Sequence, residues 1–503
     1  MKNITASKLY DYIQCPHKVW RDVYGSQEEK IDPNPFVQLL WDKGTSHEKK
    51  IIHGIGEYLD LSEIPFSERS EMTIEAMKNK TPLIYQGVIK YDDLLGIPDL
   101  LKFMPDGQYI PIDIKSGKGF DGADQADDEP GKPKKHYAVQ LCLYSDVLNK
   151  LGFGKDFQGS IIDISGTKVD YPLMDAQGSR NPSTWWDEYE DIKTKVKLLL
   201  ENKTHNKPAL GSPCKLCDWS KSCKKWCKET EDLTNIFYLG RGKRDVLNTD
   251  LGITKVGEIP DMDISSLMEK KKKDKTFLIG IAETTLQKVI KRANVVIGAK
   301  PVFYRPITFP FVSKELFFDI ENDPTQDLVY MHGVYERTGD KTVFKPFVAK
   351  SNDSNSEKEA WQEFWDYIRS LGSDDYAVYY YSAHEKTTYR KMRELYPDVV
   401  TEEELETFFS RPDTIDLYND IILKDTDWPL PSYSVKEIAT YLGFKWRDAT
   451  PSGALSIQWY NDYLEKNDPE ILNRILEYNE DDCIAMLAIK DGIEKLQEEN
   501  HAR

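Results

Sequence analysis

The chain has 503 residues and a formal net charge of −18 at pH 7. This length exceeds what one hydrophobic core supports, so we expect two or three domains. The acidic balance argues against a protein that coats nucleic acid passively, because such coating requires an excess of lysine and arginine. No run of about 18 apolar residues and no apolar N-terminal signal core occur, so we expect a cytoplasmic protein without a membrane span.

Five of the seven cysteines fall into two groups that are far apart in the sequence. Cys15 lies in a helical N-terminal stretch. Cys214, Cys217 and Cys223 follow much later with the spacing Cys-x₂-Cys-x₅-Cys, and Cys227 comes four residues further on. This density of thiolates in a reducing compartment predicts zinc or an iron–sulfur cluster rather than disulfides.

Residues 96–118 predict a β-hairpin with reactive side chains at its strand ends. The first strand carries Asp99, Pro-Asp-Gly at 105–107 supplies a turn, and the second strand carries Asp113 and Lys115. The period of two puts Asp113 and Lys115 on one face of their strand. Two carboxylates beside a lysine suit hydrolysis of a phosphodiester with a hard cation such as Mg²⁺ or Mn²⁺, and the lysine can stabilise charge or orient water.

Helical patterns flank this hairpin. Residues 41–55 predict a helix with His47 three residues after Gly44, and residues 116–136 predict a loop rich in Gly, Asp and Lys. In the helix after the loop, Gln140 and Tyr144 are four residues apart and therefore share one face.

These motifs resemble, in the same order, those of RecB-like PD-(D/E)XK nucleases. The resemblance implies a restriction-endonuclease-like core in which Gln-x-x-x-Tyr lines the site near the substrate or the attacking water. The residues it assigns are the metal ligands His47, Asp99 and Asp113 and the catalytic residues Lys115, Gln140 and Tyr144. The alternative is a surface hairpin whose charges are solvated.

The cysteine pattern resembles that of iron–sulfur nucleases related to the CRISPR-associated exonucleases and to helicase–nucleases of recombination. In that family a 4Fe–4S cluster joins the two ends of the nuclease domain, and the ligands here would be Cys15, Cys214, Cys217 and Cys223. Closing a loop of roughly 200 residues should stabilise the fold considerably. The alternative is a zinc site with Cys227 as fourth ligand and Cys15 in the core, because sequence does not identify the metal.

Residues 229–300 differ in character from the part before them. Short helical patterns are separated by turns that contain Gly252 and Gly280. They predict a helical linker or, by resemblance, a helix–hairpin–helix module, which holds nucleic-acid backbone through turn amides.

A second acidic pattern begins after residue 301. Residues 315–321 predict an apolar strand that ends in Asp319-x-Glu321, with both acids on one face. The last long helix carries Tyr478 and Asp482 four residues apart, again on one face. The elements expected in between are strands at 328–335, 341–347 and 376–381 and helical stretches that open near residues 384, 414, 433 and 476. This succession suits a ribonuclease H-like fold.

The Asp-x-Glu strand and the terminal Tyr-x-x-x-Asp helix resemble the DEDD exonucleases of the tyrosine subtype. The resemblance assigns Asp319, Glu321 and Asp482 as ligands of two cations and Tyr478 as the residue that orients the attacking water. That family usually has aspartate at its third acidic position, whereas this chain has Glu385 at the matching strand-to-helix junction. Asp416 is the rival, although it looks more like a supporting residue that does not touch the metal. An inactive scaffold is the alternative for this half.

The whole sequence predicts an α/β chain: a PD-(D/E)XK nuclease core stapled by a metal cluster at 1–228, a helical linker at 229–300 and a ribonuclease H-like mixed-sheet exonuclease domain at 301–503. The resemblance implies a metal-dependent nuclease that hydrolyses single-stranded or end-containing DNA at two separate sites, with RNA left open. Alternatives are an iron or redox sensor, and a module that binds nucleic-acid ends or partners a helicase. No Gly-x₄-Gly-Lys-[Ser/Thr] loop occurs, so a helicase motor would be a separate chain.

Overall fold

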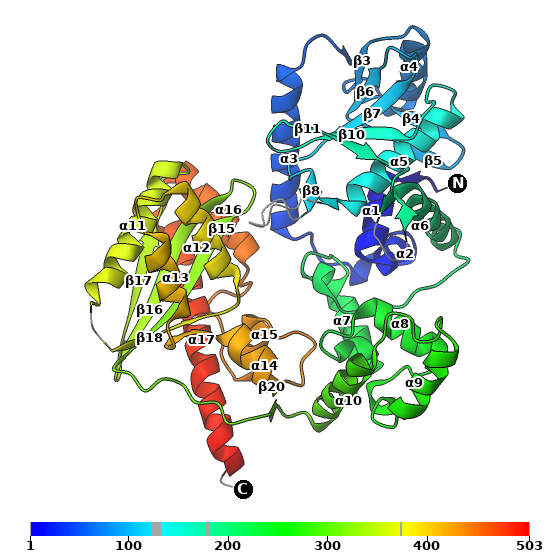
Figure 1. Cartoon of the computed structure of the whole chain (residues 1–503). Coiled ribbons are helices and arrows are strands. Elements are labelled where there is room, and N and C mark those ends of the chain that lie inside the picture. Colours follow the sequence, from blue (N-terminus) through cyan, green and yellow to red (C-terminus); the bar gives the residue numbers. More distant parts are fainter. Residues whose placement is uncertain (1, 122–131, 178–181, 373–374, 502–503) are drawn as a thin grey trace. The chain divides into compact units, whose positions relative to one another are not determined.

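The computed structural model describes residues 2–121, 132–177, 182–372 and 375–501. The chain forms two compact units, Met1–Pro208 with Pro213–Ser222, and Ala209–Ser212 with Cys223–Arg503 (Figure 1). Along the chain, α7 (Ser220–Glu229) leads from the first unit into the second. Among the described residues, none of the helices combines the length and the apolar character that crossing a membrane requires.

The first unit is built on a six-stranded mixed sheet in the order β11-β10-β7-β6-β3-β2. Its strands are β2 (Leu59–Asp60), β3 (Leu83–Tyr85), β6 (Leu100–Phe103), β7 (Tyr109–Ile114), β10 (Gln158–Ile162) and β11 (Lys168–Pro172). Smaller pairings join β1 (Ile4–Thr5), β5 (Leu94–Gly96) and β4 (Ile89–Tyr91), β8 (Phe120–Asp121) with β9 (Lys132–Pro133), and β12 (Ala176–Gln177) with β13 (Ser183–Thr184). The helices are α1 (Ala6–Gln14), α2 (Pro16–Tyr24), α3 (Pro35–Gly54), α4 (Phe66–Lys78), α5 (Lys135–Lys150) and α6 (Trp185–Leu200).

The predicted hairpin is confirmed as β6 and β7. The two strands pair antiparallel, with Leu100 opposite Ile112, and Gly107 in the turn takes the left-handed conformation (φ +89°) that glycine tolerates. All six residues of β7 are buried, and its other edge pairs in parallel with β10. A strand covered on both faces in this way holds its polar side chains rigidly.

Helix α5 forms the centre of the first core. Every residue from Ala138 to Leu148 except Gln140 is buried, and the helix packs on β7 and β10 and against α1 and α6. The described part of the stretch predicted as a loop at 116–136 contains regular structure. Strands β8 and β9 pair within it, and α5 already begins at Lys135. Residues 122–131 of that predicted loop lie outside the described residues.

The second unit begins with a helical part that has its own core. Its helices are α8 (Gly240–Leu251), α9 (Ile264–Lys273) and α10 (Glu283–Gly298). Leu247, Ile259 and Leu286 are completely buried in this cluster. Gly252 ends α8 in the left-handed conformation, and Gly280 takes the same conformation between α9 and α10, so both predicted turns are present.

A five-stranded sheet in the order β17-β16-β15-β18-β19 follows. Its strands are β15 (Lys314–Asp323), β16 (Leu328–Thr338), β17 (Lys341–Val348), β18 (Tyr376–Tyr380) and β19 (Thr414–Asp416); β14 (Val302–Phe303) pairs separately with β20 (Thr426–Asp427). The helices are α11 (Ser354–Ser370), α12 (His384–Leu395), α13 (Glu402–Ser410), a π-helix at Leu417–Ile422, α14 (Leu423–Asp425), α15 (Val435–Tyr441), α16 (Gly453–Lys466) and α17 (Pro469–His501).

Several element boundaries differ from the predictions, and two of these differences lie in the second unit near the candidate site. Residues 414–416 form a fifth strand parallel to β18 before the helical stretch begins, because β-branched Thr414 and Ile415 pair with the sheet edge. The last helix starts at Pro469, earlier than predicted, since Asp468 accepts a hydrogen bond from the Glu470 backbone N–H and proline suits a first helical turn.

The alternation along β15 separates the core from the candidate site. Leu316 and Phe318 pack in the apolar layer formed with α11, α12 and α13. Phe317 packs in the layer on the other face, together with Cys483 and Met486 of α17. Because Asp319 and Glu321 follow Phe317 at intervals of two, they lie on the face of β15 that packs against α17.

Candidate functional site

Three carboxylates of the second unit converge at the end of β15. Asp319 and Glu321 come from the strand and Asp482 from α17, and each offers an oxygen within 4.8 Å of the others. Glu321 and Asp482 are buried, and Asp319 is half-buried. Within the described residues this is the only group of three or more His, Cys, Asp or Glu with such spacing. The structure therefore brings these three predicted acids together.

Neighbouring donors hold the three acids in place. Asn479 Nδ2 donates to Asp319 Oδ2 (2.8 Å), Trp446 Nε1 donates to Asp482 Oδ1 (2.7 Å), and the Tyr330 hydroxyl donates to Glu321 Oε2 (3.3 Å). Such donors fix the orientation of ligating carboxylates. Sequence reasoning missed all three donors, although Asn479 lies three residues before Asp482 and thus on the same helical face.

Burial and mutual repulsion set the charge state of this group. Burial raises the pKa of Asp319 well above its ordinary value, and the charges of Asp482 and Glu321 raise it further. Burial, together with Asp482, raises the pKa of Glu321 to about 8, and burial also raises the pKa of Asp482. Lys436 is a nearby cation that opposes these shifts. Crowded oxygen ligands with excess negative charge fit a hard divalent cation such as Mg²⁺ or Mn²⁺.

Tyr478 lies beside the carboxylates and is held by a lysine. Lys436 Nζ donates to the Tyr478 hydroxyl oxygen (2.8 Å) and to the backbone carbonyl of Pro451 (2.9 Å). Burial and the charge of Asp482 raise the pKa of Tyr478 well above its ordinary value, so the phenol keeps its proton. Sequence reasoning missed Lys436; its signal was a lone lysine in the first turn of a short helix capped by Ser434.

Glu385 and Asp416, the two candidates for the third acid, are engaged differently. Asp416 Oδ1 accepts from the backbone N–H groups of Ser382 (3.0 Å), Tyr418 (3.0 Å) and Asn419 (2.9 Å), which is a helix-capping role. Glu385 is 3% exposed, and its Oε2 has no hydrogen-bond partner among the described residues. Burial raises the pKa of Glu385 well above its ordinary value, and its charge acts on Asp319. Neither acid belongs to the group of three within 4.8 Å.

Gly333 of β16 leaves the space that Asn479 occupies. A Cβ added at Gly333 would lie 1.7 Å from Asn479 Oδ1. We expect Gly333→Ala to push Asn479 away from Asp319 and to lower the free energy of unfolding by about 1–3 kcal/mol, as overpacking does. Urea denaturation of the metal-free protein measures this. Gly453→Ala is the control, because its Cβ would meet nothing nearer than 3.8 Å; an equal loss in both variants would contradict the argument.

A second set of charged residues lies in the first unit, where β6 begins and β7 ends. Asp99 Oδ2 accepts from the Ile114 backbone N–H (2.7 Å), and Asp113 Oδ1 accepts from the Asp99 backbone N–H (3.4 Å). Lys115 Nζ forms an ion pair with Asp113. Burial and the charge of Asp113 raise the pKa of Asp99 well above its ordinary value. Burial alone would lower the pKa of Lys115. The negative charges of Asp113 and Asp99 have the larger effect together, so the pKa of Lys115 is raised.

The helix α3 contributes a glutamate to this neighbourhood. Glu48 Oε1 accepts from Gln86 Nε2 (2.6 Å), which also lies 3.0 Å from Asp99 Oδ1, and the charge of Glu48 raises the pKa of Asp99. Sequence reasoning missed Glu48, which directly follows the predicted ligand His47. The His47 ring places Nε2 3.2 Å from the backbone carbonyl oxygen of Asp163. Within the described residues, His47 does not join Asp99 and Asp113 in a group with ligand atoms within 4.8 Å.

Gln140 and Tyr144 contact each other on α5, as their spacing predicts. Gln140 Nε2 donates to the Tyr144 hydroxyl oxygen (2.8 Å), and that hydroxyl donates to the backbone carbonyl of Ile97 (3.2 Å). The ring packs so closely on Gly96 that an added Cβ would lie 2.6 Å from it. Burial and the charge of Asp113 raise the Tyr144 pKa well above its ordinary value, which places this tyrosine in the field of the β7 acid.

The predicted cluster cysteines share partial burial. Cys15 lies between α1 and α2, Cys214 in a 3₁₀ turn at Ser212–Lys215, Cys217 after that turn and Cys223 in α7; all four are half-buried. Burial raises the pKa of Cys217 to about 11, and Cys15 is close enough to contribute. Cys227 is completely buried, and its sulfur accepts from the Thr234 hydroxyl (3.9 Å).

Over the part of the chain that is described, no cysteine belongs to a group of three or more ligand atoms within 4.8 Å of one another. The thiols are thus not gathered as tightly as ligands of a single zinc ion would be. A 4Fe–4S cube spreads its ligands further apart than one ion does, so this spacing does not identify a cluster either.

One family model matches the chain. The model, described as RNase_H superfamily, covers residues 316–493. The matched stretch contains Asp319, Glu321 and Asp482, so the chain carries a ribonuclease H-like domain around the carboxylate group. No curated protein matches the chain.

Proposed function

We propose that this protein is a nuclease that hydrolyses nucleic-acid phosphodiesters at the carboxylate group of its ribonuclease H-like domain. The observation that carries the proposal is the convergence of Asp319, Glu321 and Asp482 within the matched residues. These acids would hold Mg²⁺ or Mn²⁺, which supplies charge neutralisation at the phosphate and lowers the pKa of bound water. Glu385, with its unbonded Oε2, is the further acid next to Asp319.

Tyr478 and Lys436 complete this site in the proposal. Lys436 Nζ donates a hydrogen bond to the oxygen of the Tyr478 hydroxyl. The proton of that hydroxyl therefore points to a different acceptor. Asp482 is one such acceptor. In the proposal the hydroxyl turns its proton from Asp482 to an attacking water at the carboxylates, as the tyrosine of the DEDD resemblance does. Removal of nucleotides from strand ends is the mode we propose for this domain.

The first unit contributes the second nuclease site in this proposal. Asp99 and Asp113 lie on adjacent strand ends with Lys115 on the same face, and Glu48 adds an acid through Gln86. The raised pKa of Asp99, caused by burial and by the charge of Asp113, matches what a divalent cation would relieve. The proposed division is a PD-(D/E)XK module at 1–228, a helical linker at 229–300 and the exonuclease domain at 301–503.

A 4Fe–4S cluster on Cys15, Cys214, Cys217 and Cys223 is the structural cofactor we favour. The proximity of Cys15 to Cys217, across most of the first unit in sequence, supports it. Cys227 is completely buried and its sulfur accepts from the Thr234 hydroxyl, and the proposed ligand set does not include it. The role of such a cluster would be to hold the ends of the first module together.

The proposed substrate is single-stranded DNA or DNA with free ends. The experiment that tests this also includes RNA. End-labelled DNA and RNA should be incubated with Mg²⁺ or Mn²⁺ and with wild type, Lys115→Ala, Asp319→Ala or the double variant, all purified without oxygen. We expect each single variant to lose a different product ladder and the double variant to lose both. Lys102→Ala and Asp340→Ala, which change exposed residues nearby in sequence, are the controls.

If only one variant changes the products, the other module is a scaffold. Binding without cleavage by the wild type at either metal would replace this proposal with a module that binds nucleic-acid ends, alone or with a separate helicase.

A further inference from the structure

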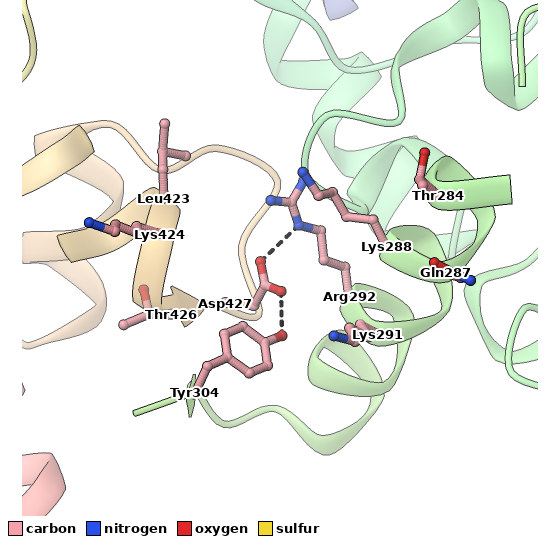
Figure 2. A pocket seen from close by; sticks show the side chains of 10 residues that line it. All are labelled: Thr284, Gln287, Lys288, Lys291, Arg292, Tyr304, Leu423, Lys424, Thr426 and Asp427. Carbon is pink, nitrogen blue, oxygen red and sulfur yellow. Dashed lines mark hydrogen bonds and ion pairs between the residues drawn. The ribbon is translucent and has the colours of Figure 1, made fainter. Parts of the chain in front are cut away.

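A cavity of about 550 Å³ lies within the second unit, between α10 and the segment of residues 423–427 (Figure 2). Its lining includes four basic side chains, Lys288, Lys291, Arg292 and Lys424, and one acid, Asp427. In a chain whose net charge is −18, this concentration of positive charge runs against the overall balance. None of these residues belongs to the carboxylate site.

The basic side chains of α10 form one face of that helix. Lys288, Lys291 and Arg292 recur at intervals of three and four residues, and Figure 2 shows them along the side of α10 that lines the cavity. Leu286 and Ala293 are completely buried in the core of the helical part. The helix is therefore held by its apolar face while its basic face lines the cavity.

The buried wall of the cavity is a fixed ion pair. Arg292 is 5% exposed; its Nε donates to Asp427 Oδ1 (2.8 Å) and its Nη1 to the Phe237 backbone carbonyl (3.0 Å). The Tyr304 hydroxyl donates to Asp427 Oδ2 (2.6 Å), so both oxygens of the single acid are engaged. The guanidinium also lies 4.8 Å from the centre of the Phe237 ring, so this side chain is fixed on several sides.

Three lysines at the rim leave their charge unpaired. Lys288, Lys291 and Lys424 are exposed, and none has a carboxylate partner in the described part of the chain. Lys291 Nζ lies 5.3 Å from the centre of the Tyr304 ring, which is the one aromatic ring of the described lining. The cavity thus offers cationic N–H donors and little surface on which a base could stack.

We propose that this cavity binds the phosphodiester backbone of the nucleic-acid strand on which the ribonuclease H-like domain acts. The inference rests on the proposed function and adds a binding site to it. Contacts by lysine and arginine to phosphates carry no base sequence, so the site would read the strand without regard to sequence.

The cavity is linked to the carboxylate site through a short segment. The Tyr433 hydroxyl donates to Asp427 Oδ1 (3.2 Å), and three residues later Lys436 of α15 reaches the Tyr478 hydroxyl. The acid in the cavity wall is therefore bonded to the same short segment that positions Tyr478.

Binding of a fluorescein-labelled single-stranded DNA oligonucleotide tests the proposal. The full chain carries Asp113→Asn and Asp319→Asn, with Ca²⁺ present, so that the strand is not cut. Adding Lys288→Ala, Lys291→Ala and Lys424→Ala should weaken binding tenfold or more at about 0.15 M salt and make the log–log salt slope less negative by about 2. The matched control, Lys272→Ala with Lys273→Ala and Lys275→Ala, removes the same charge from exposed residues of another segment and should change affinity less than twofold.

An equal loss in both triple variants would show an effect of net charge alone and overturn the proposal, as would no loss in the cavity variant. Thermal unfolding confirms that both variants fold. Unlabelled oligonucleotide should displace the probe, whereas thymidine 5′-monophosphate and inorganic phosphate should not do so below millimolar concentration. Equal displacement by either small anion would make the cavity a small-anion site and overturn the proposal.

The binding experiment can fail or succeed independently of the cleavage experiment that tests the proposed function. Lysine-dependent binding by a chain that never cleaves would support the cavity and reject the nuclease. Cleavage with binding that ignores the three lysines would reject the cavity alone.

Discussion

Replacing Asp319 by asparagine should abolish the cleavage assigned to the ribonuclease H-like domain while making the metal-free protein more stable. Loss of one ligand charge at the site should reduce the rate by on the order of 10³-fold, comparable to removing a key group that stabilises the transition state. The stability gain has a separate cause. Asp319 stands among acids whose mutual repulsion raises their pKa values, so neutralising it relieves the folded state.

The sign of the pH dependence follows from these shifts. In the folded protein Glu321 keeps its proton up to a pH of about 8, whereas the unfolded chain releases it near the ordinary value of 4.5. The unfolded state therefore binds fewer protons between these limits, and the stability contributed by the group falls as pH rises through that window. Asp319→Asn removes one of the repelling charges, so its advantage over wild type should grow toward pH 8, to about 1–3 kcal/mol, and vanish near pH 4.

Thermal unfolding between pH 5 and 8.5, with and without Mg²⁺, measures both effects. Wild type should gain stability on adding Mg²⁺, most strongly at high pH, and Asp319→Asn should gain much less. Asp340→Asn removes an exposed charge in the β16–β17 turn and should follow wild type throughout. A wild type whose metal-free stability rises toward pH 8 relative to Asp319→Asn would refute the argument.

Replacing Cys15 by serine should unfold the first unit at a much lower temperature and leave the second unit folded. If a cluster joins Cys15 to the distal cysteines, its loss releases a loop of roughly 200 residues, which a cross-link model values on the order of 5 kcal/mol. Differential scanning calorimetry under nitrogen should show one early transition in the variant and an unchanged late one. Limited proteolysis should then cut within residues 1–208.

Metal content distinguishes the two kinds of site. The cluster proposal predicts iron and sulfide in wild type, their loss in Cys15→Ser and their retention in Cys227→Ser. A zinc site with Cys227 as ligand predicts the reverse pattern, with zinc lost only in Cys227→Ser. Retention of both metal and stability in Cys15→Ser would remove Cys15 from the ligand set.

Local spacing was sufficient to place the residues that lie on one element. Asp113 on β7 shares a face with Lys115 just beyond the strand, and Tyr478 shares a face with Asp482 on α17, because strand and helix periods require it. The pairing of β6 with β7 followed from the turn at Gly107 and the apolar alternation on either side. In the ribonuclease H-like domain, the order of strands and helices sufficed for the fold, which the family match over residues 316–493 supports.

Contacts between segments that are far apart in the sequence could not be predicted from local spacing. Lys436 and Tyr478 lie 42 residues apart, and their hydrogen bond depends on how α15 packs against α17. Glu48 accepts a hydrogen bond from Gln86 only because α3 lies beside the strand region. The need for glycine at position 333 is apparent only from the position of the Asn479 side chain. Each of these residues is ordinary in its local sequence, so periodicity carries no signal for it.

The alternating faces of β15 constrain how this strand can change in evolution. Leu316, Phe318 and Ile320 pack in the apolar layer on one face, while Asp319 and Glu321 on the other face supply the acids. A single inserted or deleted residue would exchange the two sets, bringing carboxylates into an aromatic layer and phenylalanine to the metal-binding face. Descendants of this sequence can therefore diverge within β15 by substitution, but length changes must accumulate in the loops on either side.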